Sequence, residues 1–250
     1  MRLNNKNAVV YGAAGSMGGA VARAFAAAGA HVHLVGRTEQ TLAAVAAQII
    51  GHGGRATVAP VDVFDQAAVE AHADRVVAQD GSLDISFNAV GMNAVQDVPL
   101  IDMTLDDFMT PIVEAARSHF VTTTAAARRM TAQGSGVILL LSATAAAESR
   151  HRMGGFNLAC AGIEALNRSL AGEVGRHGVR VLCLRANFTP DTVPGLAPDD
   201  ESLAALRDDT KLARLPRLAE VAETAVYAVS DAAGAMTGAI LNLSCGALVD

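Results

Sequence analysis

Three glycines near the start of the chain have the spacing of a phosphate-binding turn. Gly12, Gly15 and Gly18 follow an apolar run at residues 7–11 and precede an alanine-rich stretch at residues 20–28. In such a turn one glycine permits the bend, one lets backbone N–H groups reach a pyrophosphate, and one allows close packing of the next helix, whose dipole favours the anion. The residues expected around the pyrophosphate of a dinucleotide are Gly12, Gly15, Ser16, Met17 and Gly18. The glycines by themselves would also suit a plain turn between a strand and a helix.

A second feature concerns the residue that would contact the ribose of a bound dinucleotide. The run at residues 31–35 is followed by Gly36 and Arg37, at the place where a protein that prefers NAD usually has an acidic residue to accept the ribose 2′-hydroxyl. The guanidinium of Arg37 suits a 2′-phosphate instead, because it can donate bidentate, charge-assisted hydrogen bonds. The sequence therefore favours NADP over NAD. The alternative is that Arg37 is a solvated loop residue.

Short β-branched runs alternate with longer alanine-rich stretches of helical period. The first helical stretches are predicted at residues 20–28 and 41–50, and strands are predicted at residues 7–11, 31–35, 57–61, 83–87, 137–141, 179–184 and 239–243. This alternation predicts a parallel sheet with right-handed crossovers and helices on both faces. We therefore expect an α/β fold, in which one Rossmann-like, doubly wound domain of about seven strands spans residues 1–250.

A long loop is predicted after the sixth strand. Pro190, Pro194 and Pro198 lie there among several aspartates. In a doubly wound sheet the loops that follow the carboxyl ends of the strands face the ligand. We therefore expect residues 188–212 to form a substrate loop or lid.

Further segments occur in a matching order along the chain. Asp62-Val63 follow the third predicted strand, Asn88-Ala89-Val90-Gly91 follow the fourth, and residues 236–246 read Met-Thr-Gly-Ala-Ile-Leu-Asn-Leu-Ser-Cys-Gly. Together with the glycine turn and the segment at residues 154–163, they resemble the short-chain dehydrogenase/reductase family over residues 6–250. The family usually writes Asn-Asn-Ala-Gly after the fourth strand, so this chain departs there. The resemblance implies that the residues that hold the adenine or stabilise the central sheet are Asp62, Val63, Asn88, Ala89 and Gly91.

The resemblance extends to the helix that carries the catalytic residues of the family, where the chain departs further. The family writes Tyr-x-x-x-Lys, and the alignment places Phe156 at the tyrosine and Cys160 at the lysine. In the family the tyrosine moves the substrate proton, while the lysine lowers the pKa of that tyrosine and holds the nicotinamide ribose. Phenylalanine has no proton to give, and a thiol cannot supply a fixed cation. No base is evident beside Cys160, so a small buried residue is favoured there over a nucleophile.

The other two positions of the catalytic tetrad are also replaced. The serine that orients the carbonyl aligns with Ala143, and the asparagine that holds a water of the proton relay aligns with Ala115. Ser142 would take the serine role if the loop after it were one residue longer than usual, but adjacent strand residues point to opposite faces. We therefore expect no usual catalytic function from the tetrad positions, which are occupied by Ala115, Ala143, Phe156 and Cys160.

Other polar side chains could contact a substrate. His151 has arginines on both sides and lies in the loop that lines the substrate pocket of the family, so it could titrate or help to clamp an anion. The alternative is a charged turn over the edge of the sheet. Asn157 could hydrogen-bond a substrate without moving a proton, and the resemblance places Asn187 beside the nicotinamide. His119 lies one helical turn beyond Ala115 and either faces the neighbouring helix or serves the site.

Composition limits the remaining functions. The formal net charge is −6 and the arginines are scattered, so no nucleic-acid surface is expected. The three cysteines are far apart and show no paired Cys/His spacing, which predicts reduced thiols in the cytoplasm and no metal site. No segment is suited to secretion or to crossing a bilayer.

The expected partners are a small-molecule ligand or substrate and further copies of the chain. The copies would pack through alanine-rich helices at residues 115–130 and 157–173 as a homodimer or homotetramer.

Three functions fit these observations. The first is an atypical NADP(H)-dependent oxidoreductase whose substrate, for example a conjugated alkene, accepts hydride without a tyrosine acid. The second is a non-redox enzyme on the same fold, such as a cyclase or isomerase. The third is a catalytically silent NADP-binding protein that acts as a sensor or partner subunit. The family resemblance favours the first function, and the missing tetrad favours the other two.

Overall fold

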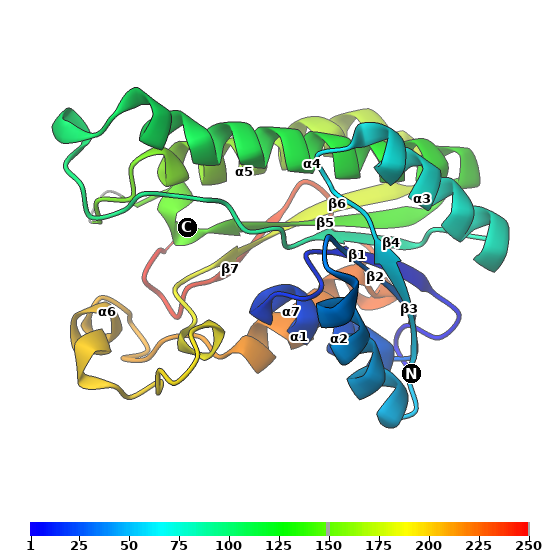
Figure 1. Ribbon diagram of the computed structural model, residues 1–250, viewed down its shortest axis with the longest axis horizontal. Helices are drawn as coiled ribbons and strands as arrows, with labels where there is room; N and C mark the ends of the chain where they lie inside the picture. Colours follow the sequence, from blue (N-terminus) through cyan, green and yellow to red (C-terminus); the bar gives the residue numbers. More distant parts are fainter. Residues whose placement is uncertain (149–150, 250) are drawn as a thin grey trace.

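A sheet of seven parallel strands runs through the centre of the molecule (Figure 1). The computed structural model describes residues 1–148 and 151–249. The strands are β1 (Asn7–Tyr11), β2 (His31–Gly36), β3 (Arg55–Pro60), β4 (Ile85–Asn88), β5 (Gly136–Ala143), β6 (Val179–Ala186) and β7 (Ile240–Leu243). Their order in the sheet is β3-β2-β1-β4-β5-β6-β7. The order reverses between β1 and β4, and a doubly wound sheet binds its ligand at the carboxyl ends of the strands beside such a reversal.

Helices cover both faces of this sheet (Figure 1). One face carries α3, α4 and α5, and the other carries α1, α2 and α7. The helices are α1 (Ser16–Ala27), α2 (Glu39–Gly51), α3 (Gln66–Asp80), α4 (Leu105–Gln133), α5 (Gly155–Val174), α6 (Ala204–Asp208) and α7 (Leu218–Val229). Within the described part of the chain, none of these helices has the length and apolar character needed to cross a membrane.

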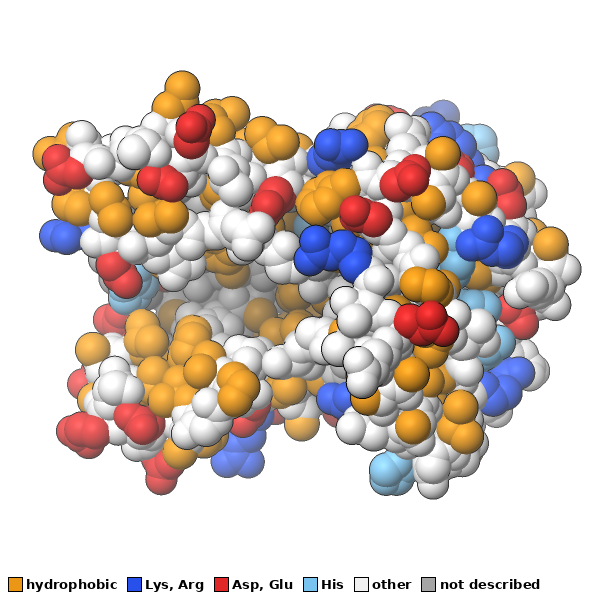
Figure 2. Space-filling model, in the orientation of Figure 1, with side chains coloured by type: hydrophobic (Ala, Val, Ile, Leu, Met, Phe, Trp, Pro, Cys, Tyr) orange, Lys and Arg blue, Asp and Glu red, His pale blue; other side chains and the backbone are white. Residues whose placement is uncertain are grey.

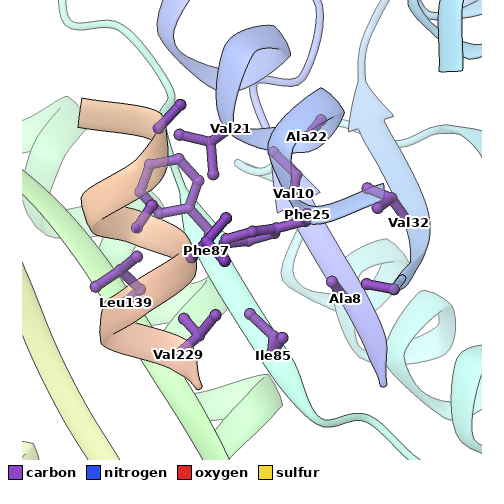
Figure 3. Packing of buried hydrophobic residues seen from close by; sticks show 14 of the residues in the cluster. Ala8, Val10, Val21, Ala22, Phe25, Val32, Ile85, Phe87, Leu139 and Val229 are labelled. Carbon is purple, nitrogen blue, oxygen red and sulfur yellow. The ribbon is translucent and has the colours of Figure 1, made fainter. Parts of the chain in front are cut away.

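Two apolar layers separate the helices from the sheet. Along β1 the side chains alternate, so that Val10 packs in the layer under α1 and α7, and Tyr11 packs in the layer under α3 and α4. In the first layer the rings of Phe25 on α1 and Phe87 on β4 meet edge to face, with centroids 6.4 Å apart (Figure 3). This geometry suits aromatic pairs because the positive ring edge meets the negative ring face. The buried layers fix the strands whose ends build the site.

Tyr11 lies immediately before Gly12, the first glycine of the turn. It is the last residue of β1 and only 1% exposed. Burial raises the pKa of its phenol far above the usual range. Tyr11 is therefore a core residue, with no part in proton transfer.

All seven predicted strands are present, each with its bounds shifted by only a few residues. The helices begin earlier than predicted. The first starts at Ser16 rather than residue 20 because Gly15 serves as its N-cap and the last glycines of the turn are already helical. The long helix starts at Leu105 rather than residue 115 because the hydroxyl of Thr104 accepts a hydrogen bond from the backbone N–H of Asp107, at 3.1 Å.

Candidate cofactor and catalytic site

Gly12 and Gly18 lie where no side chain would fit. Gly12 has φ of +73°, and a Cβ built on it would lie 2.7 Å from the carbonyl oxygen of Ala89 on the neighbouring strand connection. A Cβ on Gly18 would overlap the carbonyl oxygen of Gly12. Glycine is the residue that tolerates a positive φ and such close backbone approach. The turn between β1 and α1 therefore depends on glycine at both positions.

The N-terminus of α1 opens onto a groove of about 460 Å³. Its N-cap, Gly15, brings no capping side chain, and the first turn of the helix contains no acidic residue. The first N–H groups of a helix lack partners within the helix, and its dipole attracts an anion to that end. Gly12 and Ala14 line the same groove. The residues present therefore fit the pyrophosphate of a dinucleotide, with Ser16 and Met17 in the first turn of α1.

Arg37 lies on the wall of this groove beside Gly36, the last residue of β2. Its side chain is exposed. The chain thus brings a guanidinium, rather than a carboxylate, to the end of the second strand. The hydroxyl residues Thr38 and Thr41 line the groove next to it. Sequence reasoning did not select these threonines, although their place at the start of α2, directly after Arg37, was a usable signal.

Asp62, Val63 and Phe64 follow β3 and form another part of the same wall. The carboxylate of Asp62 accepts a hydrogen bond from the backbone N–H of Phe64, at 3.0 Å, which fixes the turn after the strand. The first two are the residues that the family resemblance assigns to the adenine. The structure brings them to the groove, and their contact with adenine stays a prediction.

Asn88 joins the central strand to a helix. Its amide nitrogen donates to the hydroxyl of Thr122 on α4 at 3.0 Å, and its amide oxygen accepts from the backbone N–H of Val90 at 2.9 Å. Both contacts are made by a side chain that is almost fully buried, so they hold the turn after β4 in place. Ala89 and Gly91 in that turn line the cofactor groove.

The same wall includes a pair that sequence reasoning did not recognise. Both carboxylate oxygens of Glu114 on α4 accept hydrogen bonds from Asn93, one from its backbone N–H and one from its amide, each at 2.7 Å. This pair ties the loop after β4 to α4 immediately before Ala115. Ala115 itself is buried in the layer beneath α4.

Phe156 and Cys160 lie one turn apart on α5, so they point to the same side of the helix. Phe156 is half-buried, while Cys160 has no exposed surface. The thiol contacts the backbone of Ala143 at the end of β5, and burial raises the pKa of Cys160 to about 12. A thiol with that pKa stays protonated at neutral pH, so it provides neither a cation nor a nucleophilic thiolate.

The hydroxyl of Ser142 is hydrogen-bonded to a buried ion pair. It donates to Glu164 on α5 at 2.8 Å, and the same carboxylate binds the guanidinium of Arg185 on β6 through two contacts of 2.7 Å. All three side chains are buried. Its neighbour Ala143 is half-buried. Because adjacent strand residues face opposite sides, Ser142 and Ala143 point away from each other, and the assignment of Ala143 to the family's serine position stays a prediction.

His151 and His119 lie near the site and contact other residues of the protein. Nε2 of His151 lies 3.8 Å from a carboxylate oxygen of Asp209, so the loop before α5 approaches the segment after α6. Of the two arginines beside His151, Arg150 lies outside the described residues. Nδ1 of His119 is 3.0 Å from the carbonyl oxygen of Ala115, within its own helix. Burial lowers the pKa of His119 to about 4, so its imidazole is neutral near pH 7.

Asn157 and Asn187 both hold loops at the carboxyl edge of the sheet. The amide of Asn157 donates to the carbonyl oxygen of Glu148 at 3.2 Å. The amide oxygen of Asn187 accepts from the backbone N–H of Phe188 at 2.7 Å and lies 3.3 Å from the hydroxyl of Thr144, which can donate to it. Thr144 and Asn187 follow β5 and β6, on the strand edge where a ligand is expected.

The segment predicted as a lid approaches the glycine turn. It includes the short 3-10 helix Pro190–Thr192, and the hydroxyl of Ser16 on α1 donates to the carbonyl oxygen of Thr192 at 3.2 Å. Asp191 accepts a hydrogen bond from the backbone N–H of Leu218 at 2.7 Å, which anchors the segment to the start of α7. Figure 1 shows the chain around α6 facing the loop before α5, and Figure 2 shows the molecule hollowed between these two parts.

Comparison with known proteins identifies the family. A family model described as enoyl-(acyl carrier protein) reductase matches residues 12–247. D-threitol dehydrogenase of Mycolicibacterium smegmatis is 31% identical over 245 residues, which cover 98% of this chain and 94% of that protein. Cis-4-hydroxycyclohexanecarboxylate dehydrogenase of Sinomonas cyclohexanicum is 34% identical over 241 residues, which cover 96% of this chain and 95% of that protein. The chain belongs to the short-chain dehydrogenase/reductase family.

A solved structure agrees with this membership. The crystal structure of a short-chain type dehydrogenase/reductase from Mycobacterium marinum matches with a TM-score of 0.87 and 26% identity, over 99% of this chain and 97% of that one. The predicted resemblance and the predicted Rossmann-like single-domain fold are therefore confirmed. The named relatives are dehydrogenases, which places this short-chain dehydrogenase/reductase among oxidoreductases.

Proposed function

We propose that this short-chain dehydrogenase/reductase is an NADP(H)-dependent oxidoreductase that works without the tyrosine acid of its family. The proposal rests on the difference between the cofactor groove and the catalytic positions on α5. The groove keeps its glycine turn, an uncapped helix N-terminus and Arg37, while the thiol of Cys160 is fully buried where the family has lysine. Such a site can hold a cofactor, but its α5 does not bring the tyrosine and lysine that would protonate a ketone oxygen.

Different residues of the groove would bind different parts of NADPH. The N–H groups at the start of α1 would hold the pyrophosphate, and Arg37 would hold the 2′-phosphate. Bound NADPH would supply a hydride from its nicotinamide ring. Thr144 and Asn187, which are 3.3 Å apart at the ends of β5 and β6, would position polar groups of the bound molecules without moving a proton. Phe156 would contribute an apolar wall beside them.

The absence of a positioned acid favours one class of substrate. Reduction of a ketone places negative charge on oxygen, and a positioned acid normally accelerates that step by about 10²–10⁴-fold. A conjugated alkene can accept hydride at carbon while its charge is delocalised onto a carbonyl oxygen, and water can then protonate the neighbouring carbon. The hydroxyl of Thr144 would donate to that oxygen in place of the amide oxygen of Asn187. We therefore propose activated alkenes as the substrate class, with water as the proton source.

Cofactor preference gives the first prediction. NADPH is expected to bind more tightly than NADH, and Arg37→Ala is expected to weaken NADPH binding by about 10- to 100-fold while it leaves NADH binding nearly unchanged, because charge-assisted hydrogen bonds contribute about 1.5–3 kcal/mol. Calorimetric titration with both cofactors measures this. Added salt should reduce the preference, since exposed charges are screened.

The matched control for that experiment is Arg55→Ala. Arg55 is also exposed, but it begins β3 at the edge of the sheet away from the groove. Its replacement should leave both affinities as they are. Equal affinities of the wild-type protein for NADPH and NADH, or a preference that survives Arg37→Ala, would show that Arg37 does not select the cofactor.

Self-association gives the second prediction. The exposed apolar side chains Leu105, Met109, Val113 and Phe120 follow α4 at helical spacing, so they form one stripe on its outer side. A stripe of this kind is typical of a surface that another helix covers. We propose that α4 and α5 pack against a second copy of the chain, which gives a homodimer or homotetramer.

Light scattering on wild-type protein at micromolar concentration is expected to give a multiple of the monomer mass, and Val113→Glu should shift it toward the monomer by placing a charge in the contact. The control is Ile50→Glu, on α2, where an equally exposed apolar residue lies on the other face of the sheet. A monomer mass for the wild type would contradict the assembly, as would a Val113→Glu protein with an unchanged mass.

A further inference from the structure

Two histidines and an aspartate meet at the amino-terminal edge of the sheet, away from the cofactor groove. His31 and His33 are alternate residues of β2, so their side chains lie on the same face of the sheet. Asp80 is the last residue of α3, which covers that face. One nitrogen of each histidine and a carboxylate oxygen of Asp80 lie within 4.8 Å of one another. In Figure 2 histidine side chains are concentrated at this end of the molecule.

The contacts inside this cluster are close. Nδ1 of His31 is 3.2 Å from one carboxylate oxygen of Asp80, and Nε2 of His33 is 2.9 Å from the other. Yet Nδ1 of His31, Nε2 of His33 and Oδ2 of Asp80 are buried atoms without a hydrogen-bond partner. The nitrogen and oxygen atoms therefore approach one another without the alignment of N–H donors. The side chain of His33 is only 2% exposed, so this nitrogen is shielded from bulk solvent.

The two nitrogen–oxygen distances are close to the spacing of ligand atoms around one metal ion. Ligand atoms that lie about 2.0–2.1 Å from a tetrahedral zinc ion are separated from one another by about 3.3 Å. Imidazole nitrogen with carboxylate oxygen is a donor set that suits zinc and related divalent transition metals. We propose that His31, His33 and Asp80 form a binding site for a zinc-type divalent cation, with water in the fourth position.

Neighbouring residues hold the proposed metal ligands in position. Nε2 of His31 is 2.9 Å from the hydroxyl of Thr57 on β3. A metal-binding histidine commonly donates its other N–H to such a partner, which leaves the first nitrogen free to bind the ion. Asp80 is held as well, because the amide nitrogen of Asn7 donates to its backbone carbonyl oxygen at 3.2 Å. The geometry is therefore fixed by residues of three strands and one helix end.

A simple ion pair explains the cluster less well. The nitrogen atoms of His31 and His33 lie 3.2 and 2.9 Å from the carboxylate oxygens of Asp80, but the buried Nδ1 of His31 and Nε2 of His33 make no aligned hydrogen bond to them. The ring of His72 on α3 is also buried, with its centroid 6.0 Å from that of His33. A divalent cation would give these buried nitrogen and oxygen atoms the partner that they lack.

The position of the site indicates what a bound cation would do. His31 is the first residue of β2, whereas Arg37 follows the last residue of the same strand, so the two sites lie at opposite edges of the sheet. A cation there would tie the end of α3 to β2 and stabilise the fold, without taking part in hydride transfer. The side chains of His31 and Asp80 are 16% and 21% exposed, which leaves a path for the ion from solvent.

The test uses full-length protein without a histidine tag, treated with a chelator and titrated with Zn²⁺ by calorimetry. We expect one Zn²⁺ per chain with a dissociation constant in the micromolar range or below, and a higher melting temperature with Zn²⁺ than without it. Asp80→Asn and His31→Gln are each expected to weaken binding by about tenfold or more and to abolish the thermal shift. The control His177→Gln changes an exposed histidine of another segment and should bind as wild type.

Three results would overturn the proposal. They are no Zn²⁺ binding by the wild type, binding that survives both ligand variants, and binding that is lost equally in the His177→Gln control. X-ray absorption of Zn²⁺ bound to the wild type keeps the test independent of how the variants fold. Nitrogen and oxygen neighbours with imidazole scattering are expected, and sulfur neighbours would assign the ion to the cysteines instead.

Discussion

Ketone reduction with NADPH is expected to rise by about 10²–10⁴-fold over wild type when Phe156→Tyr, Cys160→Lys and Ala143→Ser are combined, because a positioned acid contributes about that much. Phe156→Tyr alone should restore little. Its phenol would keep a pKa near 10 without a cation beside it. Cys160→Lys supplies that cation one helical turn away, and Ala143→Ser supplies a hydroxyl at the end of β5. The three changes should therefore act more than additively.

The informative control replaces lysine with methionine. A triple variant with Phe156→Tyr, Cys160→Met and Ala143→Ser fills the same buried space without a charge, so it should stay near the wild-type rate. The side chain at position 160 has no exposed surface, and thermal denaturation of both triple variants shows whether a buried ammonium disturbs the fold. If the methionine and lysine variants reduce ketones equally well, Cys160 does not occupy the position of the family's lysine.

Glu164→Gln is expected to lower the free energy of unfolding by about 3–5 kcal/mol, the loss typical when one partner of a buried ion pair is removed. Both Nε and Nη2 of Arg185 bind the Glu164 carboxylate at 2.7 Å, and both side chains are about 7% exposed. The substitution keeps the shape of the side chain while it removes the charge. Urea denaturation of wild type and variant measures the difference.

A surface pair supplies the control for this measurement. Glu220 binds Arg214 through two contacts of 2.8 Å, but these side chains are 42% and 43% exposed. Glu220→Gln should therefore cost only about 0–1 kcal/mol. Replacing Glu164 and Arg185 together with leucine and methionine should recover much of the loss, because both buried charges are then removed. A loss below about 1 kcal/mol for Glu164→Gln would contradict the account of this pair.

Features that depend on local sequence could be predicted well. The alternation of strands with helices predicted the parallel sheet, because each buried strand and each crossover helix has its own period. The glycine turn could be predicted because close backbone approach at Gly12 and Gly18 excludes other residues. The direction of Ser142 followed from the two-residue period of a strand, and its contact with Glu164 agrees.

Features that depend on tertiary contacts could not be predicted. Glu164 and Arg185 lie on α5 and β6, and no spacing rule connects a helix residue with a strand residue of this kind. The approach of Asp80 to His31 and His33 could not be predicted, because it arises only when α3 packs on β2. The expectation of no metal site considered only the spacing of cysteines and histidines. Helix starts were predicted too late because caps such as Thr104 act outside the apolar period.

We propose that the site transfers hydride from NADPH without a protein acid. The direct measurement follows NADPH absorbance with wild-type protein and matched pairs of compounds, each pair being a saturated ketone and the α,β-unsaturated ketone of the same skeleton. We predict that NADPH is consumed with unsaturated members and not measurably with saturated ones. Reduction of a saturated ketone as fast as its unsaturated partner would contradict the claim, and so would the absence of any reaction in protein that binds NADPH.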